Sequence, residues 1–351
     1  MARKTGIVKD VRFLRHSAGF AHPESPDRLM SIYEMLENPG NSWKFTEIEP
    51  REATYPELTA IHSPSYVDLI AGTAGQDCVF LDPDTATSPA TYEVAKLAAG
   101  GVCNAINDVI TGDVNNAFAF VRPPGHHAEH DSAAGFCIFN NVAIGAMHAL
   151  LKHKMERILV VDWDLHHGNG TQHIFYNDPR VLYFSTHQYP YYPGTGGMEE
   201  IGRGPGKGFT VNVPLSAGAG DVDYIKIFRR ILEPVALEFQ PQLVLLSAGF
   251  DIYYQDPLGG MRVTPNGFAA LTRILLNIAD DCCQGRLVGV LEGGYHLQGL
   301  TKSAKAVLEE MLDETHCSED QFLFLEQRAF DETNFIISRV ARTIAPYWKL
   351  G

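Results

Sequence analysis

The sequence is poor in cationic residues. It contains 28 Lys and Arg against 42 Asp and Glu, which gives a formal net charge of −14. Proteins that bind nucleic acid through its phosphates need a cationic surface, so this balance argues against direct nucleic-acid binding. A cationic substrate or partner is favoured instead.

Patterned cysteines and long apolar runs are also lacking. None of the six cysteines belongs to a C-x-x-C pair, and Cys282 and Cys283 are adjacent, which suits neither a zinc knuckle nor a disulfide framework. No run of about 18 uncharged apolar residues occurs, and the first residues contain no apolar signal core. We therefore expect reduced thiols, no membrane span and a cytoplasmic location.

Short apolar runs rich in Val, Ile and Phe predict buried strands. These runs are residues 117–121, 158–164, 181–186, 209–213, 243–248 and 287–291. Helical periodicity fills several of the gaps, with helix starts predicted at Ser88-Pro89 and Thr264-Pro265 and a helix end at Thr111-Gly112. This alternation predicts one α/β domain with a mostly parallel sheet that is covered by helices on both faces.

Chemically active side chains follow four of the predicted strands. They lie in Arg122-Pro-Pro-Gly-His-His127, Asp162-Trp-Asp-Leu-His-His-Gly-Asn-Gly170, Ala248-Gly-Phe-Asp251 and Glu292-Gly-Gly-Tyr-His296. Ligands of open parallel sheets bind beyond the carboxyl ends of the strands. We therefore expect these side chains to share one rim of the sheet.

Three of these side chains form a candidate metal site. Asp164 and His166 are two positions apart, so at an extended strand end they would project to the same side. Asp251, from another strand, would complete a three-ligand site that leaves room for water, as catalytic metals require. One imidazole and two carboxylates suit Zn²⁺, and also Fe²⁺, Mn²⁺ or Co²⁺.

A catalytic metal also needs a base and an electrophilic partner for the substrate carbonyl. His126 and His127 are candidates for the base, and Asp162 is a candidate to orient one of them. Tyr295 follows two glycines and is a candidate to donate its hydroxyl to a developing oxyanion. Taken singly, most of these residues are typical of loops and caps, and their convergence is what favours a site.

Taken together, the motifs resemble the histone deacetylase superfamily, closest to its class II branch. The resemblance rests on the four segments above, on Gly135-Phe-Cys-Ile-Phe-Asn-Asn141, and on His22-Pro-Glu-Ser-Pro-Asp-Arg28, which is similar to the entrance segment of that branch. It extends from about Gly19 to about Met311. It implies the arginase/deacetylase fold and a Zn²⁺-dependent hydrolysis of a linear N-acetyl amide.

The resemblance also implies roles for individual residues. His127 matches the general base that then acts as general acid, and His126 matches its electrostatic partner, bonded to Asp162. Tyr295 matches the tyrosine that polarises the acetyl carbonyl. The matched zinc ligands are Asp164, His166 and Asp251, and the matched substrate-channel residues are Gly135, Phe136, Tyr192, Leu258 and His22. A structural K⁺ site matches Asp162, Asp164, His166, Ser185 and Thr186.

Three positions indicate which branch of the superfamily the sequence resembles. Asn169 stands beside the general base where class I members carry Asp, a departure that class II members share. Gly168 replaces the third acidic residue of two-metal ureohydrolases, which disfavours that reaction. Leu258 occupies the position of the Glu gatekeeper of polyamine-selective members, which favours acetyl-lysine in peptides or proteins as the substrate.

Two alternatives to a lysine deacetylase stay open at this point. One is a deacetylase of acetylpolyamines or other small acetylated amines. The other is a non-catalytic scaffold that binds acyl-lysine or metal, although such a scaffold has no need for His126, His127 and Tyr295 together. We assign residues 1–315 to a deacetylase catalytic domain and residues 316–351 to a helical extension packed on it.

Overall fold

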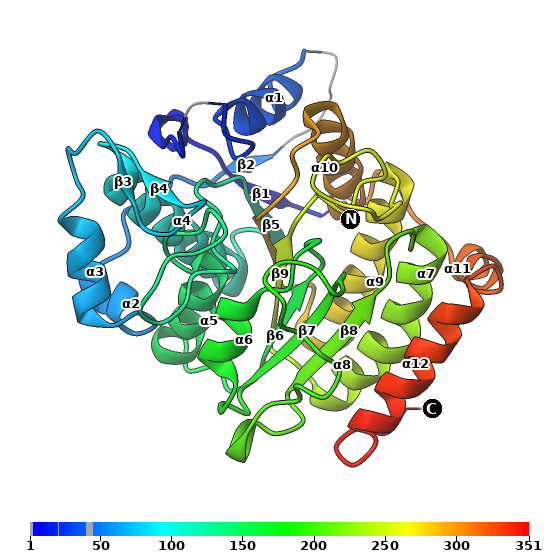
Figure 1. Ribbon diagram of the computed structural model, residues 1–351. Coiled ribbons are helices and arrows are strands. Elements are labelled where there is room, and N and C mark those ends of the chain that lie inside the picture. The colour runs from blue at the N-terminus through cyan, green and yellow to red at the C-terminus, as the bar shows by residue number, and fades with distance from the viewer. Residues whose placement is uncertain (1–2, 20, 40–44, 351) are drawn as a thin grey trace.

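The computed structural model describes residues 3–19, 21–39 and 45–350. Within these residues, eight strands form one parallel sheet in the order β2-β1-β5-β10-β9-β6-β7-β8 (Figure 1). The strands are β1 (Thr5–Val8), β2 (Thr46–Glu47), β5 (Asn116–Ala119), β6 (Ile158–Asp162), β7 (Val181–Gln188), β8 (Thr210–Leu215), β9 (Leu243–Ala248) and β10 (Leu287–Leu291). A separate antiparallel pair consists of β3 (Val79–Phe80) and β4 (Ala86–Thr87).

Helices cover the two faces of the sheet. On one face lie α2 (Tyr55–Thr59), α3 (Pro64–Ala71), α4 (Thr91–Thr111), α5 (Asn141–Lys152) and α6 (Asn169–Phe175). On the other lie α7 (Asp221–Ile227), the π-helical turn η3 (Phe228–Leu232), α8 (Glu233–Phe239), α9 (Pro265–Cys283) and α10 (Leu297–Met311). The short elements η1 (Val11–Arg15), η2 (Gly204–Gly206) and α1 (Asp27–Leu36) lie in the connections, and α11 (Glu319–Glu326) and α12 (Asp331–Ile344) follow α10.

The ends of α4 and α9 show which of the predicted capping residues terminate the helices. Thr264 caps α9 as predicted, because its hydroxyl accepts the Gly267 N–H at 3.3 Å and Pro265 takes the first helical position. Gly112 ends α4 with φ +83°, a conformation that favours glycine. Ser88, however, does not cap α4, which begins only at Thr91. The Thr91 hydroxyl instead accepts the Ser88 N–H at 2.7 Å, which adds a turn before the helix.

The segment after residue 315 packs on the sheet. Trp348 is buried and its indole N–H donates to the Gly208 carbonyl oxygen at 2.6 Å. The Thr333 hydroxyl on α12 donates to Asp223 on α7, also at 2.6 Å. The apolar side chains of Phe322, Ile336 and Val340 belong to the main core. Whether this segment is functionally separate from residues 1–315 stays a prediction.

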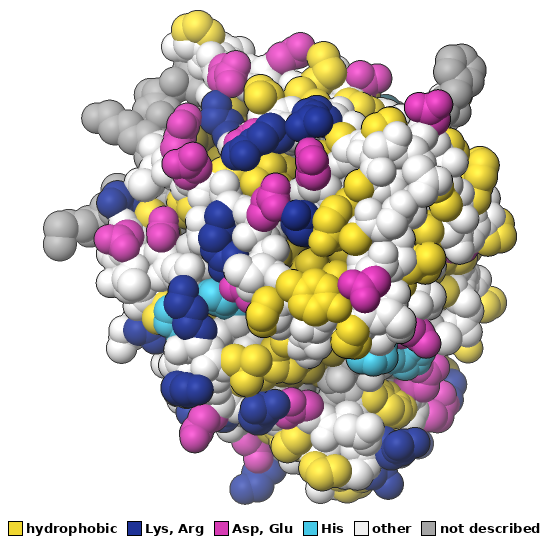
Figure 2. Space-filling view, turned by 90° about the vertical axis from the view of Figure 1, so that its left-hand side faces the viewer, with side chains coloured by type: hydrophobic (Ala, Val, Ile, Leu, Met, Phe, Trp, Pro, Cys, Tyr) yellow, Lys and Arg dark blue, Asp and Glu magenta, His cyan; other side chains and the backbone are white. Residues whose placement is uncertain are grey.

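One face of the molecule carries charges of both signs and gathers hydrophobic side chains near its middle (Figure 2). On the face shown in Figure 2, the Lys and Arg side chains of the described residues alternate with Asp and Glu and form no continuous cationic surface. Within the described part of the chain, no helix is both long enough and apolar enough to cross a lipid bilayer.

Candidate active site

Four neighbouring strands bring the chemically active segments together. β5, β10, β9 and β6 are adjacent in the sheet and run in parallel, so their carboxyl ends lie at one edge. The two histidines at positions 126 and 127, the Asp162–Asn169 segment, Asp251 and Tyr295 follow these four strands. The rim expected from the sequence is therefore the one that the topology builds.

Asp164, His166 and Asp251 place their ligand atoms within 4.8 Å of one another. His166 Nδ1 lies 3.2 Å from an oxygen of each carboxylate. Strand alternation is not the reason, because β6 ends at Asp162. Asp164 and His166 lie in the turn that follows, in which an Asp164 oxygen accepts the His166 N–H at 2.9 Å.

The structure itself tests whether this cluster suits a metal. Asp251 Oδ2 is buried and has no hydrogen-bond partner among the described residues. Burial and the neighbouring Asp164 carboxylate raise the pKa of Asp251 to about 7, because both disfavour its negative charge. A cation between the two buried carboxylates would let both stay ionised. A Cβ at Gly293 would lie 2.3 Å from Asp251 Oδ2, so only glycine permits this approach. The donor set fits Zn²⁺, with Fe²⁺ or Co²⁺ as alternatives.

A second group of potential ligands consists of Glu57, Cys103 and His148. Its only carboxylate accepts two hydrogen bonds from Arg51, at 2.6 and 2.7 Å. A guanidinium already neutralises the charge that would attract a metal ion. We interpret this group as a structural ion-pair network.

The two adjacent histidines have opposite electrostatic surroundings. His126 Nδ1 lies 3.0 Å from Asp162 Oδ2. Burial by itself lowers the pKa of His126, but the Asp162 and Asp164 carboxylates outweigh it and raise the pKa to about 10. His127 Nδ1 lies 2.7 Å from Asn169 Oδ1, and burial together with the charge of His126 holds the pKa of His127 well below its usual range. The surroundings of His126 therefore favour its protonated form, and those of His127 favour its neutral form.

A cavity of about 250 Å³ opens onto these groups. It is lined by Asp84, Pro124, His126, His127, Gly135, Phe136, His166, Tyr191, Tyr192, Leu258, Gly293 and Tyr295. The predicted channel residue His22 lies outside this lining and contacts the Phe136 ring edge-on, with centroids 4.5 Å apart. Four of the five predicted channel residues thus lie on the cavity wall, and His22 contacts one of them.

Sequence reasoning missed two residues that hold the rim. The Tyr191 ring stacks on His166, with centroids 5.7 Å apart, and its hydroxyl donates to the Leu258 carbonyl oxygen at 2.9 Å. The buried Asp256 carboxylate accepts the backbone N–H groups of Leu258 at 3.0 Å and Tyr295 at 2.7 Å. The Asp-Pro sequence signals a turn there, but no sequence signal links that turn to Tyr295.

The residues predicted to hold K⁺ gather at the ends of β6 and β7. Asp162 pairs with Ser185 in the parallel register of these strands. The Ser185 hydroxyl lies 2.9 Å from His187 Nδ1, and the Thr186 hydroxyl is buried with no hydrogen-bond partner among the described residues. The orphaned hydroxyl is compatible with a cation nearby, and the K⁺ site stays a prediction.

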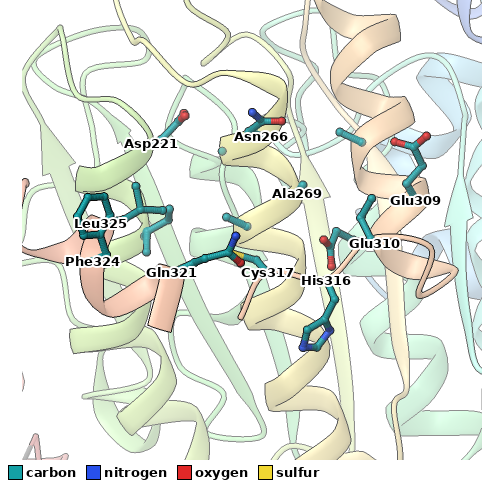
Figure 3. A pocket seen from close by; sticks show the side chains of 15 residues that line it. Asp221, Asn266, Ala269, Glu309, Glu310, His316, Cys317, Gln321, Phe324 and Leu325 are labelled. Atoms are coloured by element: carbon teal, nitrogen blue, oxygen red, sulfur yellow. The ribbon is translucent and has the colours of Figure 1, made fainter. Parts of the chain in front are cut away.

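A larger cavity, of about 530 Å³, lies away from this edge of the sheet. Figure 3 shows that it crosses α9, with Glu309 and Glu310 of α10 on one side and Phe324 and Leu325 of α11 on the other. Its buried carboxylate, Glu310, is paired with Arg273 at 2.7 Å. The smaller cavity at the strand ends is therefore the candidate active site.

Known proteins are similar in sequence to this chain over most of its length. A probable deacetylase of Archaeoglobus fulgidus is 43% identical, over 84% of this chain and 82% of the relative. The histone deacetylase HDA1 of Candida albicans is 42% identical over 89% of this chain, and the polyamine deacetylase HDAC10 of Homo sapiens is 43% identical over 82%. The chain spans only 41% and 44% of the length of these two eukaryotic relatives.

A solved structure matches the fold of this chain, and a family model matches its sequence. The crystal structure of the HDA15 HD domain superposes with a TM-score of 0.91 at 38% identity, over 99% of this chain and 96% of that one. This likeness confirms the predicted α/β fold. The family model for the histone deacetylase domain matches residues 22–311. The chain belongs to the histone deacetylase family, as the motifs at its strand ends predicted.

Proposed function

We propose that the chain is a Zn²⁺-dependent amidohydrolase that removes acetyl groups from lysine side chains of peptides or proteins and releases acetate. One observation carries the proposal: His127, Tyr295 and His166, which belongs to the cluster of candidate metal ligands, line a single cavity. Asp164, His166 and Asp251 would hold the ion. A bound Zn²⁺ supplies Lewis acidity, which polarises a carbonyl group and lowers the pKa of water.

His127 is the proposed base. Its Nδ1 is engaged by Asn169, so Nε2 is the nitrogen available to take a proton from water and return it to the leaving amine. His126 is the proposed electrostatic partner, since its bond to Asp162 keeps a positive charge beside His127. The centroids of the two imidazole rings are 4.0 Å apart.

Tyr295 is the proposed donor to the substrate carbonyl oxygen. Burial raises the pKa of its phenol well above the usual range, so the hydroxyl keeps its proton. A protonated hydroxyl in a dry cavity stabilises negative charge that develops on an oxygen. The Phe136 ring meets Tyr295 edge-on, with centroids 5.9 Å apart, and holds the phenol against the wall.

The shape and charge of the cavity support an acetylated cationic chain. The aromatic walls, including Phe136 and Tyr192, suit the aliphatic part of lysine. Leu258 leaves its position in the wall uncharged, which favours lysine over polyamines. Acetylpolyamine hydrolysis is the second candidate, because a polyamine deacetylase is among the relatives and Asp84 adds a carboxylate to the lining.

Tyr295→Phe tests the proposal. Loss of the hydroxyl should lower kcat by about 10²–10³-fold while Zn²⁺ content stays the same, since the ring packing is kept. The assay uses an acetyl-lysine tripeptide and acetylspermidine, with and without a chelator. Tyr254→Phe, which removes an exposed hydroxyl outside the cavity, is the matched control.

The outcomes separate the candidates. We expect a higher kcat/KM for the tripeptide, and loss of activity on chelation. A strong preference for acetylspermidine would favour the polyamine candidate. Full activity of Tyr295→Phe would contradict the assigned role, and a metal-loaded protein that turns over neither substrate would contradict the proposal as a whole.

A further inference from the structure

We infer that Glu129 is a positioning residue that determines which nitrogen of His127 acts as the base. The inference rests on the base role proposed for His127. Asn169 links the two residues: its Oδ1 lies 2.7 Å from His127 Nδ1, and its Nδ2 donates to Glu129 Oε1 at 2.6 Å. A carboxylate thus stands one side chain beyond the amide that contacts the base.

The orientation of the Asn169 amide is set by which neighbouring groups can donate a hydrogen bond. A carboxylate only accepts hydrogen bonds, whereas a side-chain amide has a donating end and an accepting end. Glu129 therefore requires the amide nitrogen of Asn169 on its own side, which turns the amide oxygen toward His127. That oxygen accepts a proton from Nδ1, so the neutral imidazole carries its lone pair on Nε2, where a base needs it.

The reversed amide would disable the base. With the nitrogen of Asn169 toward His127, Nδ1 would have to accept a hydrogen bond. The proton of the neutral ring would then sit on Nε2, which could no longer take a proton from water. Asn169 alone permits both orientations, and among the described residues the Glu129 carboxylate distinguishes them.

Glu129 is fixed relative to both partners. Its backbone N–H donates to the Ser132 carbonyl oxygen at 2.9 Å, and its own carbonyl oxygen lies 2.8 Å from Nδ1 of the buried His62. His173, one turn beyond Asn169 on α6, places Nδ1 2.8 Å from the same Glu129 oxygen that accepts from Asn169. The Glu129 side chain is 23% exposed, so its replacement does not open the core.

Glu129→Gln is the first test. The glutamine side chain can donate as well as accept, so it no longer imposes one amide orientation. We expect kcat to fall roughly tenfold, as for loss of one charge-assisted bond, with KM, Zn²⁺ content and melting temperature unchanged. Asp131→Asn removes one negative charge from the same loop, on an exposed side chain, and should leave kcat unchanged.

Asn169→Asp supplies the rescue. A carboxylate at position 169 accepts from His127 Nδ1 directly, so Glu129 becomes unnecessary and its charge repels the new one. In that background Glu129→Gln should raise kcat rather than lower it. The same loss in both backgrounds, or no loss in the wild-type background, would overturn the inference.

A second readout does not depend on turnover. In Zn²⁺-loaded protein with ¹⁵N-labelled histidine, NMR distinguishes the two tautomers of His127, whose signals are assigned by their loss in His127→Gln. We expect the Nδ1-protonated form in the wild type and a mixture of tautomers in Glu129→Gln. An unchanged tautomer in that variant would refute the inference even if the protein deacetylates none of the substrates tested.

Discussion

At the scale of single residues, the site contains buried charged groups, each of which is unfavourable unless an opposite charge lies beside it. Asp164 and Asp251 are both buried beside His166, and Asp251 Oδ2 lies 3.2 Å from His166 Nδ1 without a hydrogen bond of good geometry among the described residues. The other oxygen accepts the Leu165 N–H at 2.9 Å. A chain that buries two carboxylates side by side gives up stability unless a cation joins them.

Asp251→Asn should therefore change stability in opposite directions with and without metal. In the metal-free protein it removes the charge of one of two adjacent buried carboxylates that share the His166 imidazole, which should raise the free energy of unfolding by about 1–3 kcal/mol. With Zn²⁺, the wild type gains stability from the bound ion, and the variant should lose that gain. Thermal unfolding in chelator and in a Zn²⁺ titration measures both effects. An equal rise with Zn²⁺ in both proteins would show that Asp251 is not a ligand.

At the scale of helices and strands, short apolar runs rich in Val, Ile and Phe predicted most of the sheet. The expected runs 243–248 and 287–291 coincide with β9 and β10, and the other four match strands with ends displaced by one or two residues. β1 and β2 were missed because they are short and β1 contains Gly6, so pairing with distant strands decides them.

The residues of the candidate site likewise fall into a group that the sequence predicted and a group that it missed. Residues directly after strands, such as Asp251 and Tyr295, were predicted to share a rim because a parallel sheet gathers its carboxyl ends. The contacts of Glu129, Tyr191 and Asp256 depend on the path of irregular loops, which has no period to reveal it. The sequence therefore predicted the chemically active side chains of the site but not the loop residues that position them.

The packing of α12 and the segment after it on β8 gives a prediction at this scale. The Trp348 ring meets Phe209 and Phe239 edge-on, and its N–H is bonded to Gly208. Trp348→Ala should lower the free energy of unfolding by about 3 kcal/mol because it leaves a cavity and an unpaired carbonyl. Activity at 25 °C should not change.

Urea unfolding and a deacetylation assay on the same samples test this expectation, with Lys349→Ala as a control on an exposed neighbour. A variant with normal stability would mean that the segment after residue 315 adds little to the core. A stable variant with reduced activity would mean that this segment acts on the site.

At the scale of the whole molecule, the net charge of −14 acts through its field. Under the proposed function, a metal ion at Asp164 and Asp251 offsets part of their charge, and the remaining acidity would attract cationic substrates over a distance that salt controls. The screening length falls from about 30 Å at 0.01 M salt to about 3 Å at 1 M.

We therefore expect kcat/KM for an acetyl-lysine peptide flanked by arginines to fall as NaCl rises at fixed K⁺, with kcat nearly constant. A peptide of the same length with neutral flanks is the control and should respond little. Steady-state kinetics across the salt series gives the comparison. Equal responses of the two peptides would show that the field of the protein does not guide the substrate.

The Asp256 carboxylate has a consequence for how this site evolves. It ties the turn that carries Leu258 to the backbone that presents Tyr295. A substitution that shifts this turn to admit a bulkier acyl group also displaces the tyrosine, so gains in substrate range there come with losses in turnover. Phe136 lies on another part of the wall but contacts the Tyr295 ring edge-on, so it is linked to the tyrosine as well. Changes of substrate range in descendants of this sequence should therefore come with second changes that restore the position of Tyr295.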